Sequence, residues 1–62
     1  MRWTWTSSYN DDEHEFTWNG EADDGARDVV WQYNEGGAFW TSHGDFPTLA
    51  RAQAACERYW AS

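Results

Sequence analysis

The sequence predicts a single α+β domain, in which an antiparallel sheet of four to five strands is followed by one C-terminal helix packed on one face. Apolar and polar residues alternate in short runs over the first 42 residues, and a period of two is typical of strands. Turn-forming residues separate these runs. After Pro47 the apolar spacing becomes helical. With 62 residues, the chain is expected to form one domain, over residues 1–62.

Two strands are expected near the N-terminus. Residues 2–6 alternate strictly and are aromatic or β-branched, as in a strand. A loop is expected next, and then a second strand over residues 13–18, with its aromatic rings inward and its glutamates outward. Asn19 and Gly20 predict a tight hairpin turn, because both residue types tolerate positive φ angles. Residues 21–23 would return as a short strand.

The next hairpin is expected between residues 28–33 and residues 38–42, joined by a glycine-rich loop. Its second strand contains Phe39 and Trp40 side by side. Adjacent strand residues point to opposite faces, so one of these two rings is expected to lie outside the core.

A helix is predicted over residues 49–60, which are rich in Ala, Gln, Glu and Arg. Thr48 precedes it as the expected N-cap, because its hydroxyl can accept a hydrogen bond from an N–H of the first turn. The apolar stripe of this helix is expected to comprise Leu49, Ala52, Cys56, and Tyr59 or Trp60.

The core is expected to be aromatic. The chain has 12 aromatic residues, six of them Trp, while Met1, Val29, Val30 and Leu49 are its whole supply of larger aliphatic side chains. Each aromatic side chain can bury roughly 150–250 Å². Such rings can therefore supply the apolar area that so few aliphatic residues cannot.

The net charge of −7 argues against several kinds of partner. A protein that binds nucleic acid directly would carry a basic patch, and an anionic membrane would repel this chain. No apolar run approaches the roughly 18 residues of a membrane span. Cys56 is the only cysteine, so no internal disulfide is expected and a reducing cytosol is the natural compartment.

No cofactor, metal site or catalytic residue is predicted. His14, His43 and Cys56 lack the close paired spacing of structural zinc ligands. Cys56 lies on the apolar stripe of the helix, where a thiol behaves as a small hydrophobe. A domain with one helix on one sheet also offers little room for a catalytic cleft, so an enzyme is the remote interpretation.

The negative charge is concentrated in residues 11–28, where Arg27 is the only basic residue and the other charges of the chain cancel. Because like charges in proximity cost stability, this concentration suggests a use. The alternative is that acids simply gather in solvated turns and favour solubility. We expect these acids to form one anionic face that binds a partner. They are Asp11, Asp12, Glu13, Glu15, Glu21, Asp23, Asp24 and Asp28.

The C-terminal run over residues 46–57 is similar to the tails of small phage and mobile-element proteins, in which a short sheet precedes one helix that opens near Thr-Leu. The whole chain, with Trp3, Trp5 and the acidic run over residues 10–24, resembles small anti-CRISPR proteins, the type I-C inhibitors most of all. This resemblance implies an inhibitor that mimics double-stranded DNA. It would block the PAM-reading groove of a CRISPR surveillance complex (Cascade) in the cytoplasm of the bacterial host.

Two other function classes stay open. A small acidic interaction or regulatory module would use a spare aromatic face for a partner or a second copy, although a monomer is favoured over a dimer. Its binding would be insensitive to salt, whereas binding by a DNA mimic would weaken steeply with salt. An unrecognised enzyme is the third class.

Overall fold

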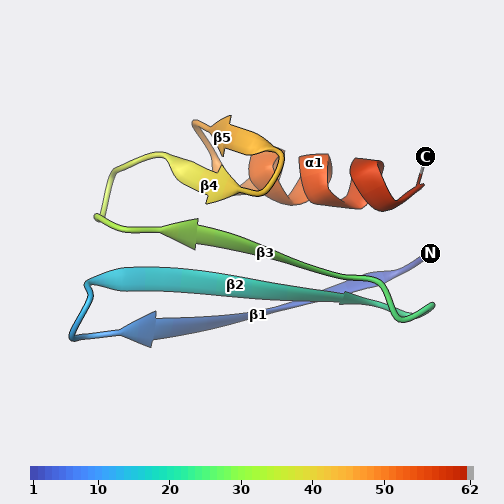
Figure 1. The fold of residues 1–62 in the computed structure, drawn as a ribbon, viewed down its shortest axis with the longest axis horizontal. Helices are drawn as coiled ribbons and strands as arrows, with labels where there is room; N and C mark the ends of the chain where they lie inside the picture. The colour runs from blue at the N-terminus through green and yellow to red at the C-terminus, as the bar shows by residue number, and fades with distance from the viewer. Residues whose placement is uncertain (62) are drawn as a thin grey trace.

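The computed structural model describes residues 1–61 as a five-stranded antiparallel sheet and one helix, which confirms the predicted α+β fold (Figure 1). The strands lie in the sheet in chain order, so every connection is a hairpin. The elements are β1 (Trp3–Asn10), β2 (Glu15–Ala22), β3 (Arg27–Gln32), β4 (Phe39–Thr41), β5 (Gly44–Phe46) and α1 (Leu49–Ala61).

The first hairpin is longer than predicted. Ser7 and Ser8, expected in a loop, continue β1 and lie opposite Trp18 and Thr17 of β2. The turn falls at residues 11–14 instead. Serine is common in turns, but here both serines lie in the strand, where each pairs with a residue type that favours strands: Trp18 is aromatic and Thr17 is β-branched.

The predicted hairpin turn at Asn19 and Gly20 is wrong, because both residues lie inside β2. Gly20 lies opposite Trp5, and a Cβ atom at Gly20 would approach the Trp5 ring to 2.6 Å. The glycine therefore leaves space for a tryptophan ring to lie across the strand. Residues 21–22 continue β2, and the chain turns instead near Gly25, whose φ is 95°.

The remaining strands agree with the prediction more closely. β3 begins one residue earlier than expected, and β4 is a short version of the strand predicted over residues 38–42. A further strand, β5, lies where a loop was expected and pairs with β4. Phe39 packs against the core, while Trp40 is the exposed ring of the pair.

Helix α1 begins as predicted, with the Thr48 hydroxyl accepting a hydrogen bond from the Arg51 N–H at 3.2 Å. The helix packs on β3, β4 and β5. Its two buried residues, Ala52 and Cys56, meet Val30 at the centre of the core. The expected aromatic core is thus only partly correct: small side chains form the centre, and half-buried rings surround them. Within residues 1–61, no helix is long and apolar enough to cross a membrane.

Candidate functional site

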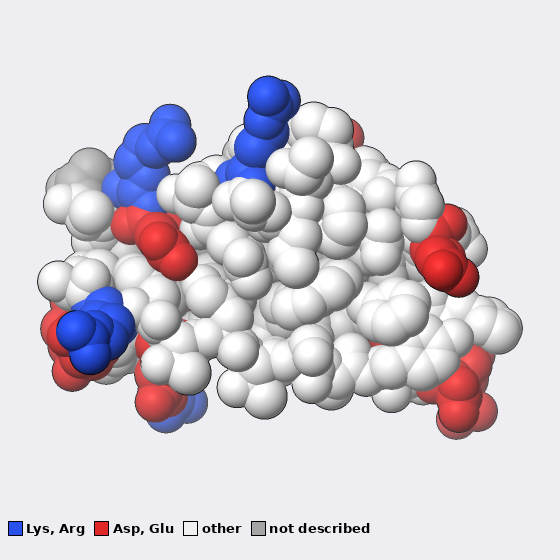
Figure 2. Space-filling model, turned by 180° about the vertical axis from the view of Figure 1, so that it is seen from behind, with Lys and Arg blue, Asp and Glu red and all other residues white. Residues whose placement is uncertain are grey.

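The structure separates the acids that were expected to share one face. The β1–β2 acidic group lies at the turn between these strands and comprises Asp11, Asp12, Glu13 and Glu15. The β2–β3 acidic group lies at the following turn and comprises Glu21, Asp23 and Asp24. Figure 2 shows acidic side chains towards opposite ends of the molecule, with a broad uncharged surface between them. The single anionic face predicted from the sequence is therefore not formed.

The length of β2 explains this separation. Successive hairpin turns lie at opposite ends of the strand that joins them, and β2 has eight residues. At about 3.4 Å per residue the two acidic groups lie roughly 25 Å apart. The longest dimension of the molecule is 33 Å. The two turns therefore place negative charge near both ends of that axis.

Little of this charge is neutralised within the chain. Arg27 Nε lies 3.0 Å from Glu21 Oε2, and both side chains are largely exposed. Within residues 1–61, Glu21 is the only member of the two acidic groups that forms an ion pair. An exposed pair of this kind contributes about 0–1 kcal/mol. The β1–β2 acidic group is therefore the more negative end, because the β2–β3 group lies beside Arg27 and beside Arg2, whose carbonyl accepts a hydrogen bond from the Asp23 N–H at 2.9 Å.

A row of aromatic rings begins on the β1–β2 hairpin and continues to β4, on the side of the sheet that carries the helix. We call Tyr9, Phe16, Trp18 and Phe39 the aromatic row. Successive ring centroids are 4.5, 6.0 and 5.6 Å apart. Because α1 packs on β3 to β5, it leaves much of this row uncovered. Tyr9 is 47% exposed, and Phe16 and Trp18 are half-buried.

Two further rings extend this surface towards the β2–β3 turn. Trp3 and Trp5 stack with centroids 5.7 Å apart and an interplanar angle of 16°. The indole Nε1 of Trp5 donates a hydrogen bond to Glu57 Oε2 at 2.9 Å. This bond ties the hairpin to the helix and fixes the ring across Gly20.

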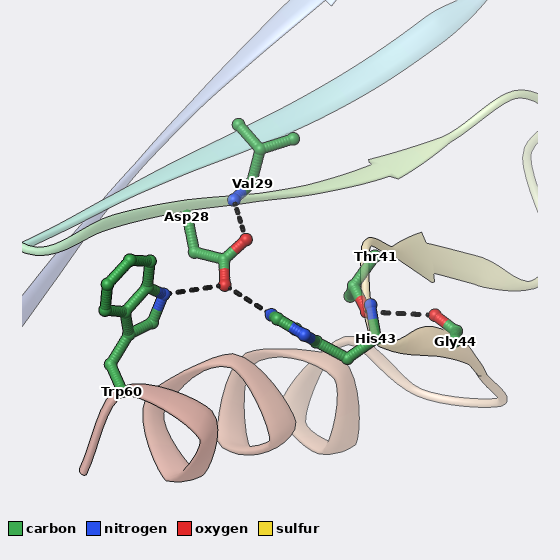
Figure 3. Close-up of polar contacts among 6 residues, drawn as sticks. All are labelled: Asp28, Val29, Thr41, His43, Gly44 and Trp60. Atoms are coloured by element: carbon green, nitrogen blue, oxygen red, sulfur yellow. Dashed lines mark hydrogen bonds and ion pairs between the residues drawn. The ribbon is translucent and has the colours of Figure 1, made fainter. Parts of the chain in front are cut away.

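Asp28 points away from the other acids and into a polar cluster beneath the helix (Figure 3). Its Oδ2 atom accepts hydrogen bonds from His43 Nε2 at 2.7 Å and from Trp60 Nε1 at 3.0 Å. Its Oδ1 atom accepts one from the Val29 N–H at 2.8 Å. Burial alone would raise the pKa of Asp28, but the hydrogen bonds, that of His43 foremost, hold this pKa below its ordinary value. Asp28 is therefore a structural anion rather than part of an exposed charged face.

His43 is held in place by the short turn between β4 and β5. Its N–H donates to the Thr41 hydroxyl at 2.9 Å, and that hydroxyl donates to the Gly44 carbonyl at 2.9 Å (Figure 3). The imidazole ring stacks on Tyr59, with centroids 4.2 Å apart. Both the backbone and the ring of His43 are thus constrained.

Cys56 completes the cluster from the helix. Its thiol is buried, and a ligand atom of each of Asp28, His43 and Cys56 lies within 4.8 Å of the others. Burial, and then the charge of Asp28, raise the pKa of Cys56 to about 12. An activated nucleophilic cysteine shows the opposite shift, so the surroundings of Cys56 do not activate it as a nucleophile.

Sequence reasoning missed this cluster because its members lie in three separate elements. The spacing between residues 28, 43 and 56 matches no local ligand pattern. Asp28 stands in the acidic segment over residues 11–28, and neither His43 nor Cys56 has a second ligand-type residue at zinc-site spacing. Asp28, His43 and Cys56 come together because α1 packs on β3, β4 and β5.

The other face of the sheet is hollowed over β1, β2 and β3. This open depression has a volume of about 720 Å³ and borders the Glu21–Arg27 ion pair. Ligand pockets usually bury most of the ligand surface. An open depression lined by threonine and asparagine does not provide that enclosure.

Comparison with known proteins finds no matching family model, no matching curated protein and no matching solved structure. The residues of this chain define a small α+β protein with two acidic ends, a partly exposed aromatic row and a buried polar cluster.

Proposed function

We propose that this protein is an acidic interaction module that binds a basic protein surface along its β1–β2 hairpin. The observation that supports the proposal is the order of side chains along that hairpin. Acids lie at both of its ends, and between them lie the exposed ring of Tyr9 and the half-buried rings of Phe16 and Trp18. One partner can therefore contact charge at two points and apolar surface in the middle.

The two kinds of side chain would contribute differently to binding. Exposed acids attract a basic partner over a distance, which raises the association rate and makes binding sensitive to salt. Aromatic rings bury large apolar areas on contact and are typical of energetically dominant interface residues. The expected partner therefore carries Lys or Arg at two places roughly 25 Å apart, with apolar side chains between them.

A second candidate is inhibition of a type I CRISPR effector, of the I-C kind, by mimicry of double-stranded DNA. The surplus charge supports it: within residues 1–61 Glu21 is the one member of the two acidic groups in an ion pair, and six of the eight predicted acids are exposed. One DNA strand carries a phosphate every 3.4 Å or so, and the acidic groups are spaced like phosphates about seven nucleotides apart. The protein would then act in the cytoplasm of the bacterial host and occupy the PAM-reading groove of the surveillance complex.

Affinity capture tests the interaction proposal directly. The immobilised full chain would be incubated with bacterial lysate, and the captured partner identified and then purified. Binding of that partner would be compared for D11N/D12N/E13Q, D23N/D24N and Y9S. Each change is expected to weaken binding about tenfold, which corresponds to ~1.4 kcal/mol. W40S is the matched control, because Trp40 is an exposed ring that points to the opposite face of the sheet from Phe39 and the aromatic row.

The outcomes separate the alternatives. Equal binding by all variants, unchanged between low and raised salt, would show that the hairpin is not the contact surface. For the CRISPR candidate, a purified type I-C surveillance complex would be mixed with a PAM-bearing duplex. Displacement of the duplex by wild type, but not by D23N/D24N, supports mimicry. If the wild-type protein does not displace the duplex, the DNA-mimic candidate is wrong. The interaction proposal is then still tested by the affinity capture.

A further inference from the structure

The buried polar cluster contains three kinds of metal ligand. Asp28 comes from β3, His43 from the turn between β4 and β5, and Cys56 from α1. One ligand atom from each lies within 4.8 Å of the other two. In a tetrahedral zinc site with bonds of about 2.0–2.3 Å, ligand atoms lie about 3–4 Å apart. The three side chains are thus already within reach of a shared ion.

We propose that Asp28, His43 and Cys56 bind a divalent transition-metal ion, and that Zn²⁺ fits them best. Thiolate, imidazole and carboxylate are all common zinc ligands. Mg²⁺ and Ca²⁺ select oxygen ligands, so a site that includes a cysteine and a histidine disfavours them. Three protein ligands leave a fourth tetrahedral position for water or an external ligand.

Neighbouring groups hold the ligands in orientation. Trp60 Nε1 and the Val29 N–H both donate to the Asp28 carboxylate, and these bonds restrict its rotation. Tyr59 stacks on the His43 ring. Hydrogen bonds and packing around the ligands are a regular feature of metal sites, and their loss weakens metal binding about 10–100-fold.

Ion binding requires only local rearrangement. The 2.7 Å hydrogen bond between His43 Nε2 and Asp28 Oδ2 would be replaced by bonds from both atoms to the ion. The Cys56 thiol would release one proton to solvent. The Nε2 proton of the neutral His43 ring would also leave to solvent while Nδ1 takes one up, so that Nε2 is free to bind the ion and the ring stays neutral. The bonds from Trp60 and Val29 to the carboxylate can persist throughout.

The ion would enter from the side of the last helical turn. The His43 side chain is 20% exposed and Trp60 is 42% exposed, while Cys56 lies at the buried end of the cluster. The site shares no residue with the aromatic row or with the two acidic groups. The metal proposal therefore does not depend on the proposed binding function.

Cobalt titration of the full, untagged chain tests the proposal, because Co²⁺ occupies zinc sites and absorbs visible light. The expected result is one bound ion with tetrahedral ligand-field bands and a thiolate charge-transfer band, both removed by excess Zn²⁺. C56S is expected to abolish the charge-transfer band and to weaken binding at least tenfold. W60F keeps the aromatic ring but loses the N–H donor, and should retain the band with about tenfold weaker binding.

Controls separate this site from adventitious binding. H14Q removes the other histidine, and D11N/D12N removes exposed acids; both should bind Co²⁺ like wild type. Circular dichroism would verify that each variant is folded, and if C56S is unfolded, H43Q and W60F decide the question. Absence of the cobalt bands in wild type would overturn the proposal. So would unchanged binding in H43Q and W60F, or loss of binding in H14Q or D11N/D12N.

Discussion

The β1–β2 hairpin and the helix-covered part of the sheet are built from different side chains. Under α1 the fully buried residues are small, namely Val30, Ala52 and Cys56. Along the hairpin the apolar residues are large rings, of which Tyr9 is exposed and the others are half-buried. The helix can approach β3 closely because its contact face is made of small residues. It contacts the hairpin through the hydrogen bond from Trp5 Nε1 to Glu57 Oε2, while much of the hairpin surface stays outside that contact.

This difference indicates that one part of the molecule provides most of the stability and the other part provides the surface for contact with a partner. The helix-covered part contains the core and the hydrogen-bonded Asp28 cluster, so it should provide most of the resistance to unfolding. The hairpin retains large apolar side chains at its surface and charge at both ends. Three substitutions test this division, and the largest effect is expected in the core.

Val30→Asp should unfold the protein. Val30 is fully buried, and an unpaired charge there costs about 3–5 kcal/mol. A chain of 62 residues has a total stability of roughly 3–9 kcal/mol. V29D is the matched control, since it adds the same charge to the same strand on the hollowed outer face. Urea unfolding followed by circular dichroism would measure both. Equal losses in V29D and V30D would contradict the assignment of the core to the helix side.

Much of the fold could be predicted from the sequence because its signals are local. Alternation located the first, second, third and fourth strands, and the Thr48 hydroxyl marked the first turn of the helix correctly. The turn predicted at Asn19 and Gly20 was wrong because glycine, which favours a turn, also leaves space for a ring to lie across a strand. The ring that occupies this space belongs to Trp5, which is 15 positions before Gly20 in the sequence. No pattern of neighbouring residues around Gly20 indicates that contact.

The candidate site was less accessible to sequence reasoning. The surplus of acids was visible, but whether they converge depends on the length of β2, which was predicted as six residues and has eight. β2 continues through Ala22, four residues beyond its predicted end, and this sends Asp23 and Asp24 to the far end of the hairpin. Asp28, one strand further, is turned inward by partners in the β4–β5 turn and in α1. These partners, His43 and Trp60, are 15 and 32 positions from Asp28, so the local sequence could not indicate their contacts with it.

Gly20→Ala tests the hairpin itself and should have an intermediate effect. The new methyl group would meet the Trp5 ring at 2.6 Å, and that ring is held by its bond to Glu57. Overpacking of this kind costs about 1–3 kcal/mol, partly offset by the lower entropy of the unfolded chain. N19A, at the exposed neighbouring position, should change stability by less than about 0.5 kcal/mol. Thermal unfolding compares the two, and a G20A loss no larger than that of N19A would contradict the ring-over-glycine contact.

Glu57→Ala should have the smallest effect, because it removes one hydrogen bond between the two parts of the molecule. A partly buried bond of this kind contributes about 0.5–1.5 kcal/mol. R58A is the control, since Arg58 is exposed on the same helix. W5F removes the indole donor but keeps a ring, so a double-mutant cycle of E57A with W5F isolates the bond itself. A coupling energy near zero in chemical denaturation would mean that the hairpin is attached to the helix by packing alone, whereas coupling of about 1 kcal/mol would show that this bond joins the contact surface to the stable core.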